Sequence, residues 1–349
     1  MSSSLQDEYI KKESLYGAKN YSPLSVVLNK GEGAYLWDVD GNKYLDMVSA
    51  YSAVSHGHSH PKLIEVIHEQ SKKLSITSRA FYTEPFADFL EKLSNLSGFE
   101  SVLTMNTGAE AVETAIKAAR RWGYFSKGIP EDKAEIIVAD GNFHGRTTTI
   151  VSFSTDDAYK KGFGPFTPGF DAANFCGSCE CNSIEKCLSI NTFKQKINEN
   201  TCAILVEPIQ GEAGIRVPRE GWLKELRALC SEKNILLILD EIQSGLGRTG
   251  KLFAYEHENI KPDGLILGKA LGGALLPISA FLSSKEIMNH FKPGSHGSTF
   301  GGNPLASKVA SKALDLLFEE KLIENSKTMG DYFLSKLKDI DSKIIKEVR

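Results

Sequence analysis

Hydrophobic and polar positions follow two patterns along this chain. Continuous apolar runs predict buried strands at 101–105, 135–139, 202–207, 235–240 and 264–268. Apolar residues recurring every three or four positions predict helices at 61–74, 109–122, 221–232 and from Pro304 onward. Because buried strands alternate with helices, we expect an α/β fold with a mostly parallel central sheet covered by helices on both faces.

A shorter pattern near the N-terminus predicts a β-hairpin. Apolar-rich segments at 33–38 and 43–48 flank Asp40-Gly41, a pair that adopts the positive φ angles of tight hairpin turns.

The least polar stretch, 264–282, is long enough for a membrane helix. It contains Lys269, Pro277 and several glycines, so we interpret it as a buried strand and loop. Residues 1–12 are polar and resemble neither a secretory nor a transit signal. We therefore expect a soluble cytoplasmic protein without membrane contact; the sequence does not distinguish this from a mitochondrial-matrix location.

Composition narrows the functional classes. The chain has 349 residues, 41% of them hydrophobic and 24% charged, which excludes collagen, low-complexity disorder and fibrous coiled coils. The net charge of −3 lacks the basic surplus of duplex-binding proteins, so we expect no nucleic-acid partner. The length suits about two domains.

Asn106-Thr-Gly-Ala-Glu110 follows one predicted strand and begins a helix. Gly108 and Ala109 would let backbone N–H groups at the helix N-terminus approach a phosphate. The same residues also suit an ordinary turn with Thr107 as the helix N-cap.

Two ionisable residues lie at the ends of other predicted strands. Asp240 ends a buried strand and needs a partner, either a cation such as a protonated ring nitrogen or a helix cap or salt bridge. Lys269 directly follows another predicted strand. Burial there would lower the pKa of its amine, and an uncharged amine suits Schiff-base chemistry. The alternative is an ordinary lysine whose amine reaches solvent or pairs with an acidic residue. Parallel strands end at one edge of a sheet, and the combined set matches what pyridoxal phosphate requires.

The sequence closely resembles the class III (fold type I) pyridoxal-phosphate aminotransferases, and among them the members that act on ornithine. The likeness extends from about Tyr16 to Arg349 except near Cys176. The matching segments are 16–21, 33–45, 49–54, 77–82, 106–113, 162–166, 206–214, 240–243, 268–271 and 296–304.

This resemblance implies roles in cofactor binding. Lys269 would form the Schiff base and move protons, and Asp240 would pair with the ring nitrogen. Phe143 would stack on the ring and Gln243 would approach its 3-hydroxyl. Thr299 would reach the phosphate of a neighbouring subunit, which implies a homodimer with shared active sites. The resemblance leaves open whether dimers assemble further.

The resemblance also implies a substrate site. Tyr21 and Arg146 match residues that hold the α-carboxylate, Tyr51 matches a tyrosine of the ornithine pocket, and Glu207 and Glu212 match a nearby acidic pair. The implied reaction transfers the δ-amino group of L-ornithine to 2-oxoglutarate, giving glutamate 5-semialdehyde and glutamate.

Several alternatives remain open at this point. His144 is a departure toward acetylornithine enzymes, so acetylornithine, 4-aminobutyrate and other ω-amino donors are same-class alternatives. Different-class alternatives are an aminomutase and a non-catalytic homologue.

The resemblance further implies the domain organisation. Residues 1–54 would be an N-terminal segment with the hairpin, part of a small domain; residues 55–303 would form the large cofactor-binding domain; residues 304–349 would begin a C-terminal small domain. Family members continue further, so the small domain is expected to be truncated and to lack an arginine that pairs with Glu212 and receives 2-oxoglutarate.

Two motifs resemble metal sites. His56-Gly-His-Ser-His60 alternates histidines, but the family has a similar loop without metal, and we expect none. An insertion near 174–190 contains four cysteines, Cys176, Cys179, Cys181 and Cys187. Their spacing is compact enough for zinc binding or redox chemistry. The alternative is a surface loop with reduced thiols.

Overall fold

A seven-stranded sheet organises the computed structural model, which describes residues 5–176, 188–345 and 347–349. The strands, in spatial order, are β4 (Ser101–Met105), β10 (Ser279–Ser283), β9 (Gly264–Leu267), β8 (Leu236–Asp240), β7 (Thr201–Val206), β5 (Glu135–Ala139) and β6 (Phe170–Ala173). The β10 strand pairs antiparallel with both neighbours, and the remaining pairs are parallel. The predicted mostly parallel sheet is therefore confirmed.

Strands β6 and β10 were not predicted from the sequence. The β10 strand completes the weakly polar stretch 264–282, which forms β9, a short 3₁₀ turn η4 (Lys269–Gly272), a loop and then β10. The interpretation of this stretch as strand and loop is thus confirmed. In the part of the chain that the structure describes, no helix has both the length and the apolarity needed to cross a membrane.

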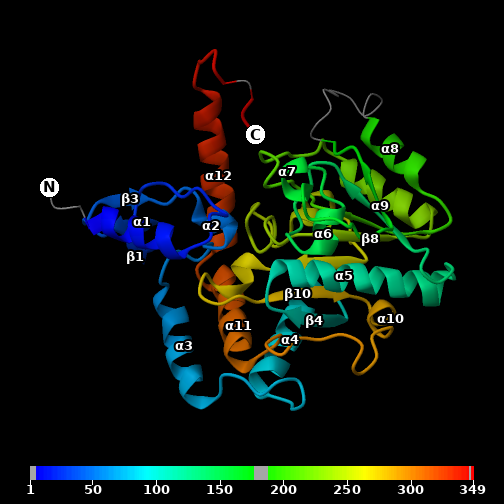
Figure 1. The fold of residues 1–349 in the computed structure, drawn as a ribbon, viewed down its shortest axis with the longest axis horizontal. Helices are drawn as coiled ribbons and strands as arrows, with labels where there is room; N and C mark the ends of the chain where they lie inside the picture. The colour runs from blue at the N-terminus through cyan, green and yellow to red at the C-terminus, as the bar shows by residue number, and fades with distance from the viewer. Residues whose placement is uncertain (1–4, 177–187, 346) are drawn as a thin grey trace.

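Helices cover both faces of this sheet (Figure 1). On one face, α5 (Gly108–Trp122) packs its apolar side against alternate strand residues such as Val138, Ile238 and Ile266. On the other face, Leu237 and Leu239 pack with residues of α4 (Glu84–Ser97), α8 (Leu188–Lys196), α9 (Trp222–Glu232) and α11 (Pro304–Glu319). Alternation of buried side chains along β8 explains why the strand is apolar throughout.

The remaining helical segments are shorter or more peripheral. They are α1 (Leu5–Tyr16), α2 (Ser49–Ser52), α3 (Pro61–Lys73), α6 (Thr148–Ser152), η1 (Gly123–Lys127), α7 (Asp157–Lys160), η3 (Ala254–Glu258), α10 (Lys285–Met288) and α12 (Leu322–Lys338). The helical prediction from Pro304 onward is confirmed by α11 and α12 as far as Lys338, whereas residues 339–345 and 347–349 are not helical. Most of α11 is buried, whereas no residue of α12 is.

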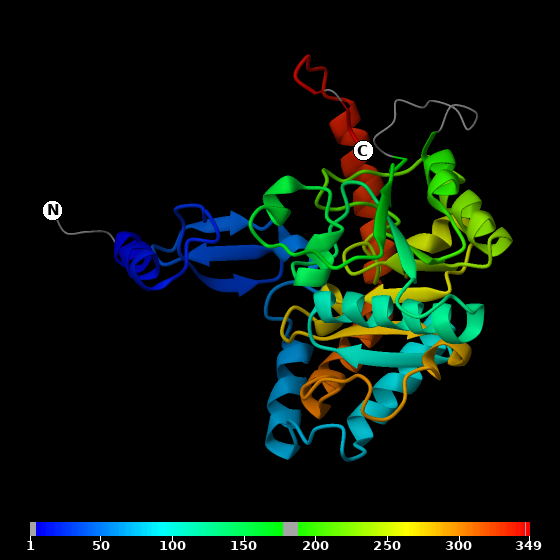
Figure 2. The same cartoon turned by 45° about the vertical axis from the view of Figure 1, so that its right-hand side comes forward.

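A small antiparallel sheet contains the predicted hairpin. Its strands are β1 (Leu28–Glu32), β2 (Tyr35–Asp38) and β3 (Lys43–Leu45), and Figure 2 shows it projecting from the seven-stranded sheet together with α1. Asp38 Oδ1 accepts hydrogen bonds from the backbone N–H groups of Asp40 and Asn42, at 3.0 and 2.8 Å, and Gly41 adopts φ +88°. The hairpin is confirmed, while the domain boundaries at 54 and 303 stay predictions.

Candidate active site

The buried strand β8 places Asp240 at the carboxyl edge of the sheet. One carboxylate oxygen, Oδ1, accepts a hydrogen bond from the backbone N–H of Ile242 at 3.0 Å. The other, Oδ2, lies 2.7 Å from Nδ1 of His144, and both side chains are buried. The side chain of Asp240 is therefore paired inside the protein with His144, which is either a cation or a neutral hydrogen-bond donor.

The neighbouring strand β9 leads directly into Lys269. This residue adopts φ +42° in η4, an uncommon angle for a residue with a side chain. Burial lowers the pKa of its amine, and the carboxylates of Glu212, Asp240 and Glu207 oppose that shift. Among the described residues no hydrogen bond or ion pair engages its Nζ atom, so the amine is available to react.

The N-terminus of α5 forms another wall. Thr107 caps the helix and exchanges hydrogen bonds with Glu110: Thr107 Oγ1 accepts from Glu110 N at 3.3 Å, and Glu110 Oε2 accepts from Thr107 N at 2.7 Å. The first N–H groups of a helix have no intrahelical acceptor, so those of Gly108 and Ala109 can meet an anion. A β-carbon on Gly108 would lie 2.8 Å from Ile242 Cδ1, which explains glycine there.

One pocket of about 200 Å³ collects most of the predicted site residues. Its lining includes Gly108, Ala109, Phe143, Glu207, Glu212, Asp240, Gln243 and Lys269. These residues come from the ends of different strands, so the strand order brings them to one edge. The pocket thus supplies a reactive amine, a buried carboxylate, an aromatic ring and free helix N–H groups, a set that fits pyridoxal phosphate.

The other four predicted residues lie outside this pocket. Tyr51 lines a neighbouring pocket that also contains Glu212 and Gln243. Tyr21 is 70% exposed, and the exposed Arg146 stacks its guanidinium 4.6 Å from the ring centre of Tyr159.

Thr299 is also exposed, in a loop beside α5. Its neighbour Ser298 accepts a hydrogen bond from Asn106 Nδ2 at 2.8 Å, which fixes the loop near the helix N-terminus. The roles of the exposed residues as substrate or phosphate ligands stay predictions.

Gln243 links the two pockets. Its Nε2 donates to Glu212 Oε1 and to the backbone carbonyl of Tyr51, both at 3.2 Å. A β-carbon on Gly211 would overlap the Gln243 side chain. The absence of a side chain at Gly211 therefore allows Gln243 to occupy this bridging position.

Two further buried groups surround Asp240. Burial raises the pKa of Glu207 to about 7, and its carboxylate accepts hydrogen bonds from Phe143 N at 3.1 Å and Gly211 N at 3.4 Å. Burial by itself would lower the pKa of His144, but the hydrogen bond and charge of Asp240 outweigh it and raise that pKa. Nε2 of His144 is buried without a hydrogen-bond partner among the described residues.

Sequence reasoning noted His144 only as a departure from the ornithine enzymes and assigned it no contact. The available signal was its place directly after Phe143 in a segment that follows β5. Because Asp240 is 96 residues away, only the fold brings the two together.

The predicted metal-like motifs have different outcomes. The three imidazoles of the histidine motif turn to separate partners: His56 Nε2 to Ala313 O, His58 Nε2 to Asp46 Oδ2 and His60 Nε2 to Glu320 Oε2. Within residues 5–176, 188–345 and 347–349, no three histidine, cysteine or acidic side chains converge as metal ligands. Cys179, Cys181 and Cys187 lie outside the described residues, and Cys176 is buried.

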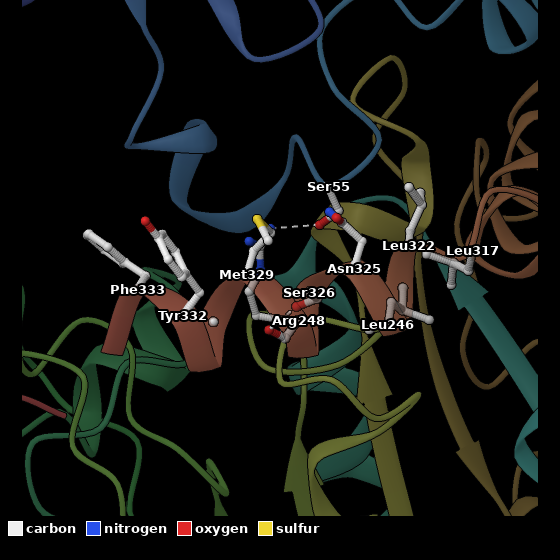
Figure 3. Close-up of a pocket in the computed structure, with 12 residues that line it drawn as sticks. Ser55, Leu246, Arg248, Leu317, Leu322, Asn325, Ser326, Met329, Tyr332 and Phe333 are labelled. Carbon is white, nitrogen blue, oxygen red and sulfur yellow. Dashed lines mark hydrogen bonds between the residues drawn. The ribbon is translucent and has the colours of Figure 1, made fainter. Parts of the chain in front are cut away.

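A larger cavity of about 500 Å³ lies between α12 and the loop after β8 (Figure 3). None of the predicted site residues lines it. Its chemistry is mixed, with Met329, Tyr332 and Phe333 of α12 beside Arg248 and Ser55. The reactive groups therefore belong to the smaller pocket at the strand ends.

Comparison with known proteins gives a consistent result. The family model for class-III aminotransferases matches residues 16–349. An ornithine aminotransferase from Halalkalibacterium halodurans is 55% identical over 97% of this chain and 82% of its own.

Solved structures are similar too. An ornithine aminotransferase structure from Toxoplasma gondii, described with partial occupancy of PLP at its active site, superposes with a TM-score of 0.94 at 41% identity, over 99% of this chain and 79% of that one. An acetylornithine aminotransferase from Elizabethkingia anophelis superposes with a TM-score of 0.84 at 52% identity, over 95% and 79%.

Proposed function

Because this chain belongs to the class-III aminotransferases, we propose that it transfers the δ-amino group of L-ornithine to 2-oxoglutarate with pyridoxal phosphate as cofactor. The products are glutamate 5-semialdehyde and glutamate. The observation that carries the proposal is the shared pocket of Lys269 and Asp240 at the ends of adjacent strands. The identity above 50% with proteins named ornithine aminotransferase supports the choice of donor.

The pocket residues divide the work of holding the cofactor. When bound, pyridoxal phosphate supplies an aldehyde that condenses with amines and a protonated ring that accepts electrons as the substrate loses a proton. Lys269 holds the aldehyde end, and its lowered amine pKa suits it to take up and release the transferred proton. Asp240, as a buried carboxylate, keeps a ring nitrogen protonated.

Other residues orient the ring and the phosphate. Phe143 would cover one face of the ring, and Gln243 would donate to a ring hydroxyl. The N–H groups of Gly108 and Ala109 would bind the phosphate, helped by the dipole of α5. Glu207 and Asp240 are buried in the wall, so their carboxyl groups are themselves largely shielded from water.

The donor must be anchored at its α-amino-acid end so that the δ-amino group faces Lys269. Tyr21 and Arg146 are proposed to hold the α-carboxylate, since a guanidinium can bind a carboxylate with two parallel hydrogen bonds. Tyr51 and Glu212 shape the space between this anchor and Lys269. Glu207 and Glu212 are proposed to lie near the donor amine, where their carboxyl oxygens can accept hydrogen bonds from it.

We further propose that the working unit is a homodimer. Thr299 is exposed on the loop beside α5, and the family resemblance implies that it reaches the phosphate site of a second subunit. A Thr299→Val variant should bind the cofactor more weakly than wild type does. This difference should be seen only at protein concentrations at which the dimer forms. Sedimentation paired with cofactor titration checks this; a monomer that retains full cofactor affinity contradicts it.

A second candidate is acetylornithine aminotransferase, favoured by His144 and by the 52% identity with the Elizabethkingia enzyme. A donor panel of ornithine, acetylornithine and 4-aminobutyrate, each with 2-oxoglutarate, separates the candidates. We expect ornithine to give the highest kcat/KM. Turnover without 2-oxoglutarate would instead indicate an aminomutase.

Lys269→Ala tests the assignment of the site itself. The variant should lose both turnover and the visible absorption of the covalently held cofactor, whereas Lys251→Ala, at an exposed lysine, should retain both. Turnover by Lys269→Ala at the wild-type rate would overturn the proposal.

A further inference from the structure

The segment α2, between the small sheet and the pocket, has an unusual backbone. Ser49, Ala50, Tyr51 and Ser52 have φ angles of 50°, 45°, 56° and 75°, so four successive residues with side chains lie in the left-handed region. Each such residue carries an energetic cost that glycine avoids. A turn of this kind persists only where its surroundings hold it.

Asp46 holds the beginning of this left-handed turn. Its Oδ1 accepts hydrogen bonds from the backbone N–H groups of Val48 and Ser49, at 3.0 and 2.9 Å. Its Oδ2 lies 2.7 Å from Nε2 of His58. Both carboxylate oxygens are therefore engaged, one with the turn and one with the imidazole.

Asp46 and His58 are both positioned by the small sheet. The N–H of Asp46 donates to Ala34 O at 2.9 Å, and His58 and Gly33 exchange two backbone hydrogen bonds of 2.8 and 3.1 Å. A β-carbon on Gly31 would lie 2.9 Å from the His58 side chain, so glycine in β1 leaves room for the imidazole. The small sheet is thus the frame for the pair.

The far side of the turn is attached to the loop after β8. Gln243 Nε2 donates to Tyr51 O at 3.2 Å, and Ser55 Oγ, just beyond the turn, accepts from Arg248 Nη2 at 2.8 Å, as the dashed line in Figure 3 shows. Tyr51 thereby lines the neighbouring pocket, whose wall shares Glu212 and Gln243 with the pocket around Lys269. The turn is thus held at both ends, while the Tyr51 side chain itself is 60% exposed.

We propose that Asp46 and His58 are positioning residues for donor selection: they hold the left-handed turn Ser49–Ser52 and so fix Tyr51 against the α-amino-acid end of the donor. This inference rests on the proposed function. Neither residue touches the pocket around Lys269, so the pair acts on donor binding rather than on proton transfer.

The test compares ornithine with 4-aminobutyrate, which lacks the α-amino-acid end. In Asp46→Ala we expect the ratio of kcat/KM for ornithine over 4-aminobutyrate to fall about tenfold, through KM for ornithine, with kcat changing less than about threefold. Glu320→Gln is the matched control, because it alters a histidine–carboxylate contact of the same loop, His60 with Glu320, away from the turn. It should leave the ratio unchanged.

A second substitution separates positioning from general loss of structure. Ala50 is exposed, so Ala50→Gly relieves the backbone penalty at one of the four left-handed positions without removing buried contacts. Adding it to Asp46→Ala should restore the donor ratio to within about threefold of wild type. A variant that is damaged only in its packing would gain nothing from this glycine.

A measurement on the cofactor-free protein gives an independent readout. Hydrogen exchange at the amides of Tyr51 and Val54, which donate to Val48 O at 3.0 Å and to Ser49 O at 3.1 Å, should accelerate at least about tenfold in Asp46→Ala and return toward wild type in the double variant. If Asp46→Ala does not fold, His58→Ala carries the same comparison, because it frees one carboxylate oxygen of Asp46.

The results distinguish this inference from the proposed function. An unchanged donor ratio in Asp46→Ala, an equal effect of Glu320→Gln, or failure of Ala50→Gly to rescue would overturn the positioning role. If wild-type protein transfers an amino group from neither donor, the proposed function fails instead, and the exchange measurement still decides whether Asp46 holds the turn.

Discussion

Nδ1 of His144 lies 2.7 Å from Oδ2 of Asp240, with both side chains buried at the carboxyl edge of the seven-stranded sheet. The contact fixes which carboxylate oxygen faces the histidine and leaves Asp240 in one orientation beside Lys269. Removing either partner of a buried pair costs more than the pair contributes, because the remaining group loses its hydrogen bond without regaining water.

Replacing the histidine should therefore weaken the cofactor site. In His144→Phe, Asp240 keeps only the hydrogen bond from Ile242 N, so its orientation is less restricted. Loss of a hydrogen bond to a charged group is worth about 1.5–3 kcal/mol, and we expect cofactor affinity to fall roughly 10- to 100-fold. Titration of the cofactor-free protein measures it. His257→Ala, at an exposed imidazole, serves as control; equal affinities of His144→Phe and wild type would contradict this role.

The raised pKa of Glu207 predicts a specific dependence of stability on pH. A carboxyl whose pKa is about 7 when folded and near 4.5 when unfolded holds its proton more tightly in the folded state. Its contribution is fully present below about pH 4.5 and is lost as pH rises through about 7. Between pH 4.5 and 8 the free energy of unfolding of wild type should fall by roughly 3 kcal/mol more than that of Glu207→Gln.

Urea unfolding of both proteins at several pH values checks this difference. Glu65→Gln, on the exposed side of α3, provides the control and should follow wild type. Parallel curves for Glu207→Gln and wild type would show that burial does not perturb this carboxyl.

Gly108→Ala should obstruct the phosphate end of the pocket. The added methyl would lie 2.8 Å from Ile242 Cδ1, inside normal contact distance, and overpacking of this kind costs about 1–3 kcal/mol. We expect weaker cofactor binding by about tenfold or more. Gly330→Ala in α12, where a β-carbon meets nothing within 4 Å, should leave cofactor affinity unaltered. Unimpaired binding by Gly108→Ala would place the phosphate elsewhere.

Thr107→Ala removes the cap of α5. The loss of the reciprocal hydrogen bonds with Glu110 should destabilise the protein by about 1 kcal/mol. Thermal unfolding measures the effect, and Thr107→Ser should restore most of it because a serine hydroxyl accepts the same bond. If serine and alanine destabilise equally, the threonine methyl rather than its hydroxyl is what matters.

Much of the architecture follows from local pattern. The apolar run before Asp240 predicted a strand buried on both faces, and the recurrence of Val112, Ala115, Ile116 and Ala119 predicted one side of a helix. Asp40-Gly41 predicted the hairpin because few dipeptides tolerate its backbone angles. The strand and loop between Gly264 and Leu282 were recognisable because a lysine, a proline and glycines are poorly suited to a membrane helix.

Strands β6 and β10 were harder to predict. The β10 strand directly follows an apolar loop, so no change of pattern marks where it begins, and its antiparallel direction depends on which strands it lies between. The residues of the candidate site likewise include some that local sequence identified and some that only the fold brought together. Lys269, Asp240 and Gly108 were identifiable because each lies at or just after the carboxyl end of a strand, which confines it to one edge of the sheet.

The sequence by itself determined the elements, the strand ends and the chemical types available there, because these depend on neighbours within a few residues. Only the tertiary structure decided which of those groups touch. His144 meets Asp240, His58 meets Asp46, and Gln243 joins Glu212 to the left-handed turn at Tyr51. Such pairings depend on strand order and on strain held by distant hydrogen bonds, and no local pattern of residues encodes either.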